Sequence, residues 1–171
     1  MLDKVILLNL VIQRLIQYRF FVDSMLGTLA KKLRMFGFDC MYNSSIDDES
    51  IISLAKIESR VIITMDSNLA INAMKRDILV IKPESHTEKE QLIEIAKKMN
   101  FKKFELQYSH CSLCNGKLNI ILEDQILEKI PPMIRRHTRN FWQCDECMHI
   151  FWEGSHIKNM KKLVGEINAR L

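Results

Sequence analysis

Two Cys-x-x-Cys pairs stand in the second half of the chain, Cys111 with Cys114 and Cys144 with Cys147. Two residues between paired cysteines let one tight turn direct both sulfurs to the same ion, and four thiolates suit a tetrahedral Zn²⁺. Such a site has no open coordination position, so it predicts a structural zinc ion. Disulfides and a redox Cys-x-x-Cys are the alternatives. The spacing favours metal binding in a reducing compartment, and we therefore expect a cytoplasmic protein.

Three aspartates stand where predicted strands end or predicted helices begin, namely Asp23, Asp48 and Asp66. Ligands of open parallel sheets bind beyond the carboxyl ends of the strands, so these carboxylates are expected to converge there. Oxygen ligands select hard cations, which predicts a Mg²⁺ or Mn²⁺ site, with Asp47 as an accessory ligand. The alternative is that each aspartate caps the N-terminus of a helix, and the two roles are compatible.

A basic stretch with neighbouring aromatic residues follows in the second half of the chain. Arg135, Arg136 and Arg139 precede Phe141 and Trp142. Cationic and aromatic side chains together can hold RNA through phosphate contacts and base stacking. The alternative is that the aromatic residues form the core of a small zinc-binding domain.

Two further residues are candidates for contact with a phosphate. Arg34 lies on the first predicted helix, and its planar guanidinium could bind a phosphate, or it could belong to a solvated helix face. His156 could contact a substrate phosphate, or it could be hydrogen-bonded at a domain interface.

Hydrophobic patterns predict the elements that must position these residues. Short apolar runs alternate with helical periods over the first hundred residues, which predicts an α/β fold with a parallel sheet flanked by helices. The apolar runs around the cysteines predict a C-terminal zinc ribbon. Strands are expected at residues 19–22, 38–42, 61–64, 78–81, 117–123, 141–143 and 150–152, and helices at 26–35, 47–55, 69–75 and 88–99.

Length and composition agree with a small folded unit joined to a metal-binding one. The 171 residues are 47% apolar and carry a net charge of +4, with most of the excess in residues 101–171. We expect a helical extension at 1–18, an α/β domain at 19–105, and a zinc ribbon with a basic C-terminal helix at 106–171. The apolar run near the start is too short to span a bilayer and lacks the features of a signal peptide, so no stable membrane insertion is expected.

Several motifs of this chain resemble those of the Mut-seven C-terminal RNase family, whose members join a PIN-like nuclease domain to a zinc ribbon. The resemblance covers residues 19–156. The motifs are Phe21-Val22-Asp23-x-x-Leu26-Gly27, Asp48-x-x-Ile51-Ile52, Thr64-x-Asp66, Cys114-Asn115-Gly116 and Trp152-Glu153-Gly154-Ser155-His156.

This resemblance implies a metal-dependent ribonuclease in which Asp23, Asp48 and Asp66 hold Mg²⁺ or Mn²⁺ and Thr64, on the substrate-binding side, orients Asp66. Its partner would be RNA, with the ribosome or RNA-processing machinery as further candidates. Many PIN nucleases have a fourth acid that has no clear equivalent here, so a non-catalytic RNA- or ribosome-binding module is the alternative.

Overall fold

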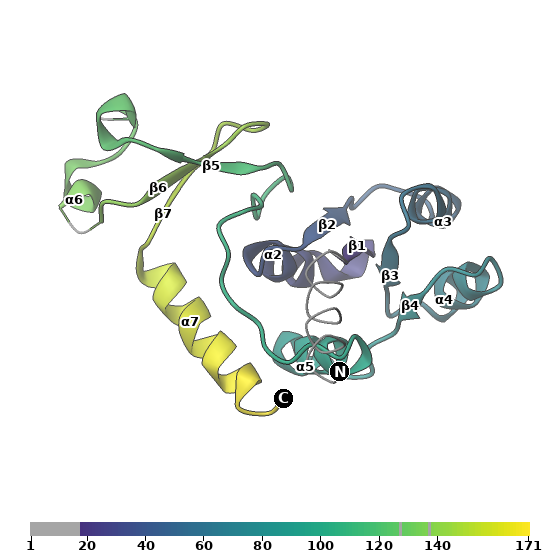
Figure 1. Cartoon of the computed structure of the whole chain (residues 1–171). Coiled ribbons are helices and arrows are strands. Elements are labelled where there is room, and N and C mark those ends of the chain that lie inside the picture. Colours follow the sequence, from purple (N-terminus) through teal and green to yellow (C-terminus); the bar gives the residue numbers. More distant parts are fainter. Residues whose placement is uncertain (1–17, 127, 137) are drawn as a thin grey trace, which may run out of the picture.

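The computed structural model describes residues 18–126, 128–136 and 138–171, so the extension predicted at 1–18 lies outside the described residues apart from Tyr18. Its first part is a parallel four-stranded sheet in the order β2-β1-β3-β4 (Figure 1). The strands are β1 (Arg19–Val22), β2 (Asp39–Tyr42), β3 (Val61–Ile63) and β4 (Val80–Ile81). The α/β class and the parallel sheet predicted from the sequence are confirmed.

Helices cover both faces of this sheet. Helices α2 (Gly27–Met35) and α5 (Glu88–Lys98) lie on one face, and α3 (Asp48–Ile57) and α4 (Ser67–Met74) lie on the other. Strand β1 explains the arrangement, because Phe20 and Val22 belong to the core under α2 and α5 while Phe21 belongs to the core under α3 and α4. Alternate strand residues point to opposite faces, so a run of apolar residues indicates a strand buried on both sides.

Close packing at the start of α2 explains why residue 27 is a glycine. A Cβ atom on Gly27 would lie 2.7 Å from the ring of Tyr42, which is closer than carbon atoms approach. The Tyr42 hydroxyl donates to the carbonyl oxygen of Ser24 in the short helix η1 (Ser24–Leu26). Gly27 therefore lets the end of β2 pack against the turn that carries Asp23.

The second part is a three-stranded antiparallel sheet, β5 (Leu118–Ile121), β6 (Phe141–Cys144) and β7 (Ile150–Trp152), with the cysteines at one end. All three strands and the cysteine cluster agree with the predicted zinc ribbon. Between β5 and β6 the chain forms η2 (Glu123–Ile126) and the single-turn helix α6 (Pro132–Arg135), which are not among the helices expected from the sequence. Proline suits the first turn of a helix because no hydrogen bond is lost there.

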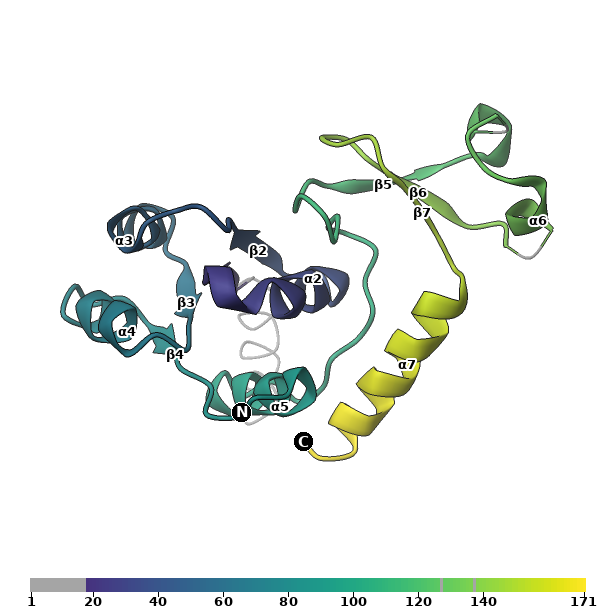
Figure 2. The same ribbon diagram turned by 180° about the vertical axis from the view of Figure 1, so that it is seen from behind.

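Helix α7 (Ser155–Asn168) joins the ribbon back to the first sheet. Figures 1 and 2 show it running from the end of β7 to the side of α5. Its Met160 and Ile167 belong to the core shared with α2 and α5. Asn168 accepts a hydrogen bond from the Phe104 N–H (2.8 Å) and donates one to the Phe104 carbonyl (2.9 Å). The last helix in the sequence thus packs on the first sheet.

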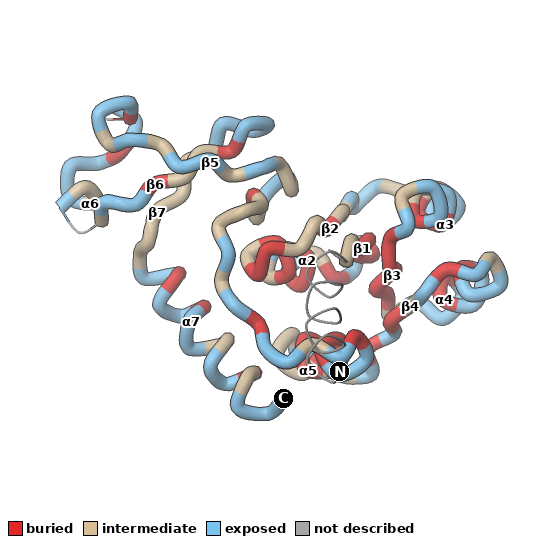
Figure 3. Tube along the Cα trace, viewed as in Figure 1, coloured by how far each residue is buried: buried red, intermediate tan, exposed pale blue. Residues whose placement is uncertain are grey.

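Burial differs between the two parts. Figure 3 shows buried residues concentrated in β1, β3 and the inner sides of the helices, whereas the ribbon strands are mostly half-buried or exposed. The ribbon core is small and centres on Ile126, Ile130 and Phe141. Among the helices of the described part of the chain, none is both long and apolar enough to cross a membrane.

Candidate functional site

Asp23 stands directly after β1, at the carboxyl edge of the parallel sheet. It is 6% exposed, and its Oδ2 accepts a hydrogen bond of 2.8 Å from the Thr64 hydroxyl. Its Oδ1 accepts from the backbone N–H and the hydroxyl of Ser24, so Asp23 also caps η1. Both carboxylate oxygens therefore have fixed positions.

Asp66 stands at the same edge, after β3. Its Oδ1 accepts from the backbone N–H groups of Asn68 (2.6 Å) and Leu69 (3.0 Å), which makes it the N-cap of α4. The Asp66 N–H itself donates to the Thr64 hydroxyl oxygen at 2.9 Å. Thr64 therefore orients the carboxylate of Asp23 and the backbone of Asp66. Thr64 itself is fully buried.

Two further acids, Asp47 and Asp48, stand at the start of α3. Asp47 caps this helix, because its side chain accepts from the Ser50 N–H (2.9 Å) and the Ser50 hydroxyl (2.7 Å). Asp48 is the first helical residue and is exposed. Partial burial raises the pKa of Asp48 above its ordinary value, and the negative charges of Asp66, Asp23 and Asp47 raise it further. Asp48 thus lies close enough to the other three aspartates for their negative charges to act on it.

The acids share an edge without forming a tight cluster. Among the described residues, only the four cysteines form a His, Cys, Asp or Glu group whose ligand atoms all lie within 4.8 Å of one another. A cationic neighbour that the sequence analysis missed is Lys82, which follows β4 and donates to the Ser67 hydroxyl at 2.6 Å. The position of Lys82 directly after a predicted strand is the sequence signal that could have identified it as a residue of this edge. Glu49, near the acids in sequence, instead pairs with Arg76.

Arg34 lies at the opposite end of α2 from the acids. It is 3% exposed, and its guanidinium donates to the carbonyl oxygens of Cys40 (2.8 Å), Ser112 (3.1 Å) and Leu113 (3.0 Å). Ser112 and Leu113 are the two residues between the first pair of cysteines. Arg34, predicted as a phosphate ligand, is thus used to hold the first cysteine turn against the sheet.

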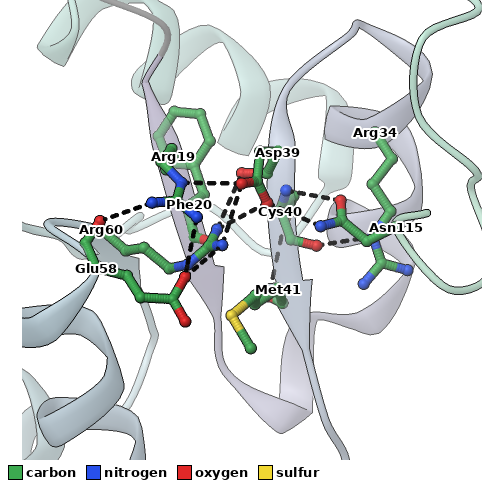
Figure 4. Close-up of polar contacts among 9 residues, drawn as sticks. All are labelled: Arg19, Phe20, Arg34, Asp39, Cys40, Met41, Glu58, Arg60 and Asn115. Carbon is green, nitrogen blue, oxygen red and sulfur yellow. Dashed lines mark hydrogen bonds and ion pairs between the residues drawn. The ribbon is translucent and has the colours of Figure 1, made fainter. Parts of the chain in front are cut away.

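An ion-pair network at the amino ends of the strands completes this junction (Figure 4). Asp39 accepts from Arg60 (2.8 and 3.1 Å), Arg19 (2.9 Å) and the Asn115 amide (2.8 Å), and the Cys40 N–H donates to the Asn115 oxygen. Burial opposes ionisation of Asp39, but these hydrogen bonds outweigh it and hold its pKa well below the usual range. No role for these residues was predicted from the sequence.

The cysteines form two matching turns. The Asn115 N–H donates to the Cys111 carbonyl (2.9 Å), and the Met148 N–H donates to the Cys144 carbonyl (3.1 Å). Asn115 and Met148 both have left-handed backbone angles, φ 75° and 59°. A Cβ atom on Gly116 would lie 2.8 Å from the Cys144 sulfur, so a larger residue would displace that ligand.

The sulfur positions fit a tetrahedral ion. Sγ atoms are 3.7 Å apart between Cys111 and Cys147 and 3.4 Å apart between Cys114 and Cys144. Zn–S bonds of about 2.3 Å in a regular tetrahedron place sulfurs about 3.8 Å apart. The four cysteines therefore form a site that could hold a metal ion such as zinc.

The predicted RNA-contacting residues lie on the ribbon and at the start of α7. Arg136 and Arg139 are exposed, Arg135 is half-buried, and Arg139 pairs with Glu123 at 2.7 Å. His156 is exposed in the first turn of α7. None of the four lies on the four-stranded sheet that carries the acids.

The fold and these two sites define a class of protein: a parallel α/β domain with aspartates at its carboxyl edge, joined to a four-cysteine ribbon. Residues 18–164 match the family model of the Mut7-C RNAse domain, which covers most of the chain and both of its parts. The chain belongs to the Mut7-C RNase domain family. Comparisons with curated proteins and with solved structures gave no match. Membership points to a nuclease-like protein whose substrate is RNA.

Proposed function

We propose that this chain is a metal-dependent ribonuclease that hydrolyses RNA phosphodiester bonds at the carboxyl edge of its parallel sheet. The observation that carries the proposal is the place of Asp48 at this edge, where burial raises its pKa and the negative charges of Asp66, Asp23 and Asp47 raise it further. Like charges gathered at one edge cost free energy unless a cation relieves them. In a member of an RNase family, such an edge suits divalent metal binding.

The acids have the chemistry that a hard cation requires. Asp23, Asp48 and Asp66 would hold Mg²⁺ or Mn²⁺ through carboxylate oxygens, with Asp47 as an accessory ligand. Such an ion neutralises phosphate charge and lowers the pKa of water. The fit is supported by the exposure of Asp48 and Asp66, which leaves their carboxylates accessible to an ion.

The surrounding residues would position the acids and the substrate. Thr64 holds the Asp23 carboxylate and the Asp66 backbone in one arrangement through its two hydrogen bonds. Lys82 is exposed beside Ser67 and could contact a phosphate of the bound strand. Part of the rate gain would come from holding the phosphodiester in line for attack.

The ribbon would contribute RNA affinity rather than chemistry. Arg136 and Arg139 expose their guanidinium groups, and Lys158 and Lys162 are exposed on α7. We assign to these side chains contacts with RNA phosphates, which would make binding weaken as salt concentration rises. Zinc would be structural, and we propose a cytoplasmic location, with RNA in processing or ribosomal complexes as the substrate pool.

The test is an assay of zinc-loaded full-length protein with end-labelled RNA and added Mn²⁺. Mn²⁺-dependent cleavage is expected, and Asp66→Asn should reduce it at least tenfold because one ligand carboxylate is lost. Asp124→Asn is the matched control, since Asp124 is an exposed aspartate on η2 of the ribbon. Intact RNA with the wild-type protein at all Mn²⁺ concentrations would refute the proposal.

The second candidate is a non-catalytic RNA- or ribosome-binding module. It is favoured by the capping roles of Asp23, Asp47 and Asp66, which account for these side chains without a metal. This candidate predicts that the wild-type protein and Asp66→Asn bind RNA equally and that neither cleaves it.

A further inference from the structure

A pocket between the ribbon and the first part of the chain includes none of the four aspartates and borders the cysteine site at Ser112. Its volume is about 330 Å³, and it is bounded by the linker before the first cysteine, by β7 and by the start of α7. Met35, at the last residue of α2, forms part of its wall. The pocket therefore lies near the end of α2 that is remote from Asp23.

The pocket walls combine aromatic rings with neutral polar groups. Among the described residues that line it there is no aspartate, glutamate, lysine or arginine. The residues that define its chemistry are Tyr108, Phe151, Trp152, His110, His149 and His156. Imidazole nitrogens can donate or accept hydrogen bonds, so flat apolar surfaces and hydrogen-bonding edges are both present. The nearby Glu153 carboxylate is already bound by the Tyr108 hydroxyl and by Lys161, so it is not a free partner for a cation, and an aliphatic ligand would leave the imidazoles unused.

Part of this wall is held rigid before any ligand binds. The Tyr108 ring stacks on Trp142 with centroids 3.9 Å apart and planes 13° apart. Its hydroxyl donates to Glu153 at 2.7 Å. Phe151, paired with Trp142 across the strands, makes an edge contact with His149. A fixed aromatic surface costs little entropy when another ring stacks against it.

Positive charge lies next to the pocket. A second hollow shares Tyr108, His110 and Leu118 with the first and is also lined by Arg19 and Lys117. Among the described residues that line this hollow, Asp39 is the one carboxylate, and it pairs with both Arg60 and Arg19. Lys117 is the lining cation for which the described residues give no ion pair. A flat heteroaromatic group in the pocket would thus have the Lys117 ammonium group nearby for an attached phosphate.

We propose that this pocket binds an unpaired base of single-stranded RNA by stacking and edge hydrogen bonds. The inference rests on the proposed function for the identity of the polymer. Helix α2 has nine residues, and a rise of 1.5 Å per residue puts its two ends about 13 Å apart. The base in the pocket therefore lies at a distance from the reacting phosphodiester and selects RNA whose bases are not paired. A base inside a duplex is already stacked and cannot enter.

The experiment follows Trp152 fluorescence as single-stranded RNA is added to zinc-loaded full-length protein. The chain has two tryptophans, so Trp142→Phe leaves Trp152 as the reporter and keeps an aromatic partner for Tyr108. Asp66→Asn is included to keep the RNA intact. Saturable quenching by a ten-nucleotide single strand is expected, with none from the matching duplex.

Two variants then test the pocket. Phe151→Leu keeps an apolar side chain and removes the ring, and loss of stacking with one base weakens binding about 5-fold to 100-fold. His156→Ala changes an exposed residue, so folding is preserved and any weakening reports a lost contact. Ile57→Ala is the control, because Ile57 is 79% exposed at the end of α3 on the far face of the sheet.

The outcomes separate this inference from the proposed ribonuclease activity. If all variants bind RNA with equal affinity and Trp152 fluorescence does not change, the pocket assignment is wrong even if the wild-type protein cleaves RNA. If Phe151→Leu and His156→Ala weaken the quenching and the wild-type protein cleaves no RNA, the base-binding pocket is supported and the proposed ribonuclease activity is refuted.

Discussion

Replacement of Arg34 by methionine should weaken both the fold and the cysteine site. The guanidinium is 3% exposed and donates to three carbonyl oxygens at 2.8–3.1 Å, two of them in the turn between Cys111 and Cys114. Methionine has similar length and no donor. It would leave these carbonyl groups without their cationic partner inside the junction.

The size of the effect follows from the number of hydrogen bonds. One hydrogen bond to a charged group contributes about 1.5–3 kcal/mol, and bonds from the same side chain are not fully additive. We therefore expect Arg34→Met to lower the free energy of unfolding by about 3–5 kcal/mol. For a chain of this size, each kcal/mol corresponds to about 2–4 °C in the melting temperature. Arg34→Lys keeps the charge but cannot reach all three oxygens, so it should fall between Arg34→Met and wild type.

Two measurements check the reasoning. Thermal or urea unfolding of the zinc-loaded protein gives the stability change, and competition with a colorimetric chelator gives the rate of zinc loss, which should rise in Arg34→Met. Arg136→Met is the matched control, because Arg136 is exposed on the ribbon and should change stability by less than about 0.5 kcal/mol. If Arg34→Met and Arg136→Met unfold alike and lose zinc at the same rate, the proposed role of Arg34 in holding the turn is wrong.

Three further predictions concern charge and thiol chemistry. The raised pKa of Asp48 means that its contribution to stability is full below pH 4 and is lost as pH rises. Without divalent ions, Asp48→Asn should therefore raise the melting temperature at pH 7 by about 1–3 °C, whereas Asp124→Asn should not. An unchanged or lower melting temperature would contradict the repulsion of Asp48 by the other aspartates. The lowered pKa of Asp39 means that its contribution to stability is present above its unfolded pKa of about 4 and is lost as pH falls below that value. The difference in free energy of unfolding between wild type and Asp39→Asn, measured with urea, should therefore narrow from pH 5 to pH 3. A constant difference would show that Asp39 is not held ionised. Burial raises the pKa of Cys40 to about 12, so a thiol reagent at pH 8 should modify the exposed Cys114 and Cys147 quickly after zinc removal and should modify Cys40 only on unfolding. Fast modification of Cys40 under native conditions, located by peptide mapping, would refute its burial.

The element pattern could be predicted from the sequence because it depends on local chemistry. The run at Phe20, Phe21 and Val22 identifies a strand buried on both faces, and the spacing of apolar residues identifies the helices. The strand predicted at residues 78–81 is shorter, Val80–Ile81, because Asp77 adopts a left-handed turn and the Ile78 N–H donates to Ala73. The single-turn helix after Pro131 was missed, since a double proline also marks a turn.

Which residues meet across the chain was decided by tertiary structure. The spacing of the cysteines alone indicated a metal site, because paired ligands within one turn are a local property, and the placement of the aspartates after strands indicated a shared edge. The use of Arg34 could not be predicted, because its partners at Ser112 and Leu113 are far away in sequence. The binding of Asp39 by Asn115 and the return of α7 to α5 are likewise long-range contacts. Local patterns determine which elements and turns form, whereas the packing of the ribbon against the sheet determines which charged side chains are buried at the junction and which remain exposed.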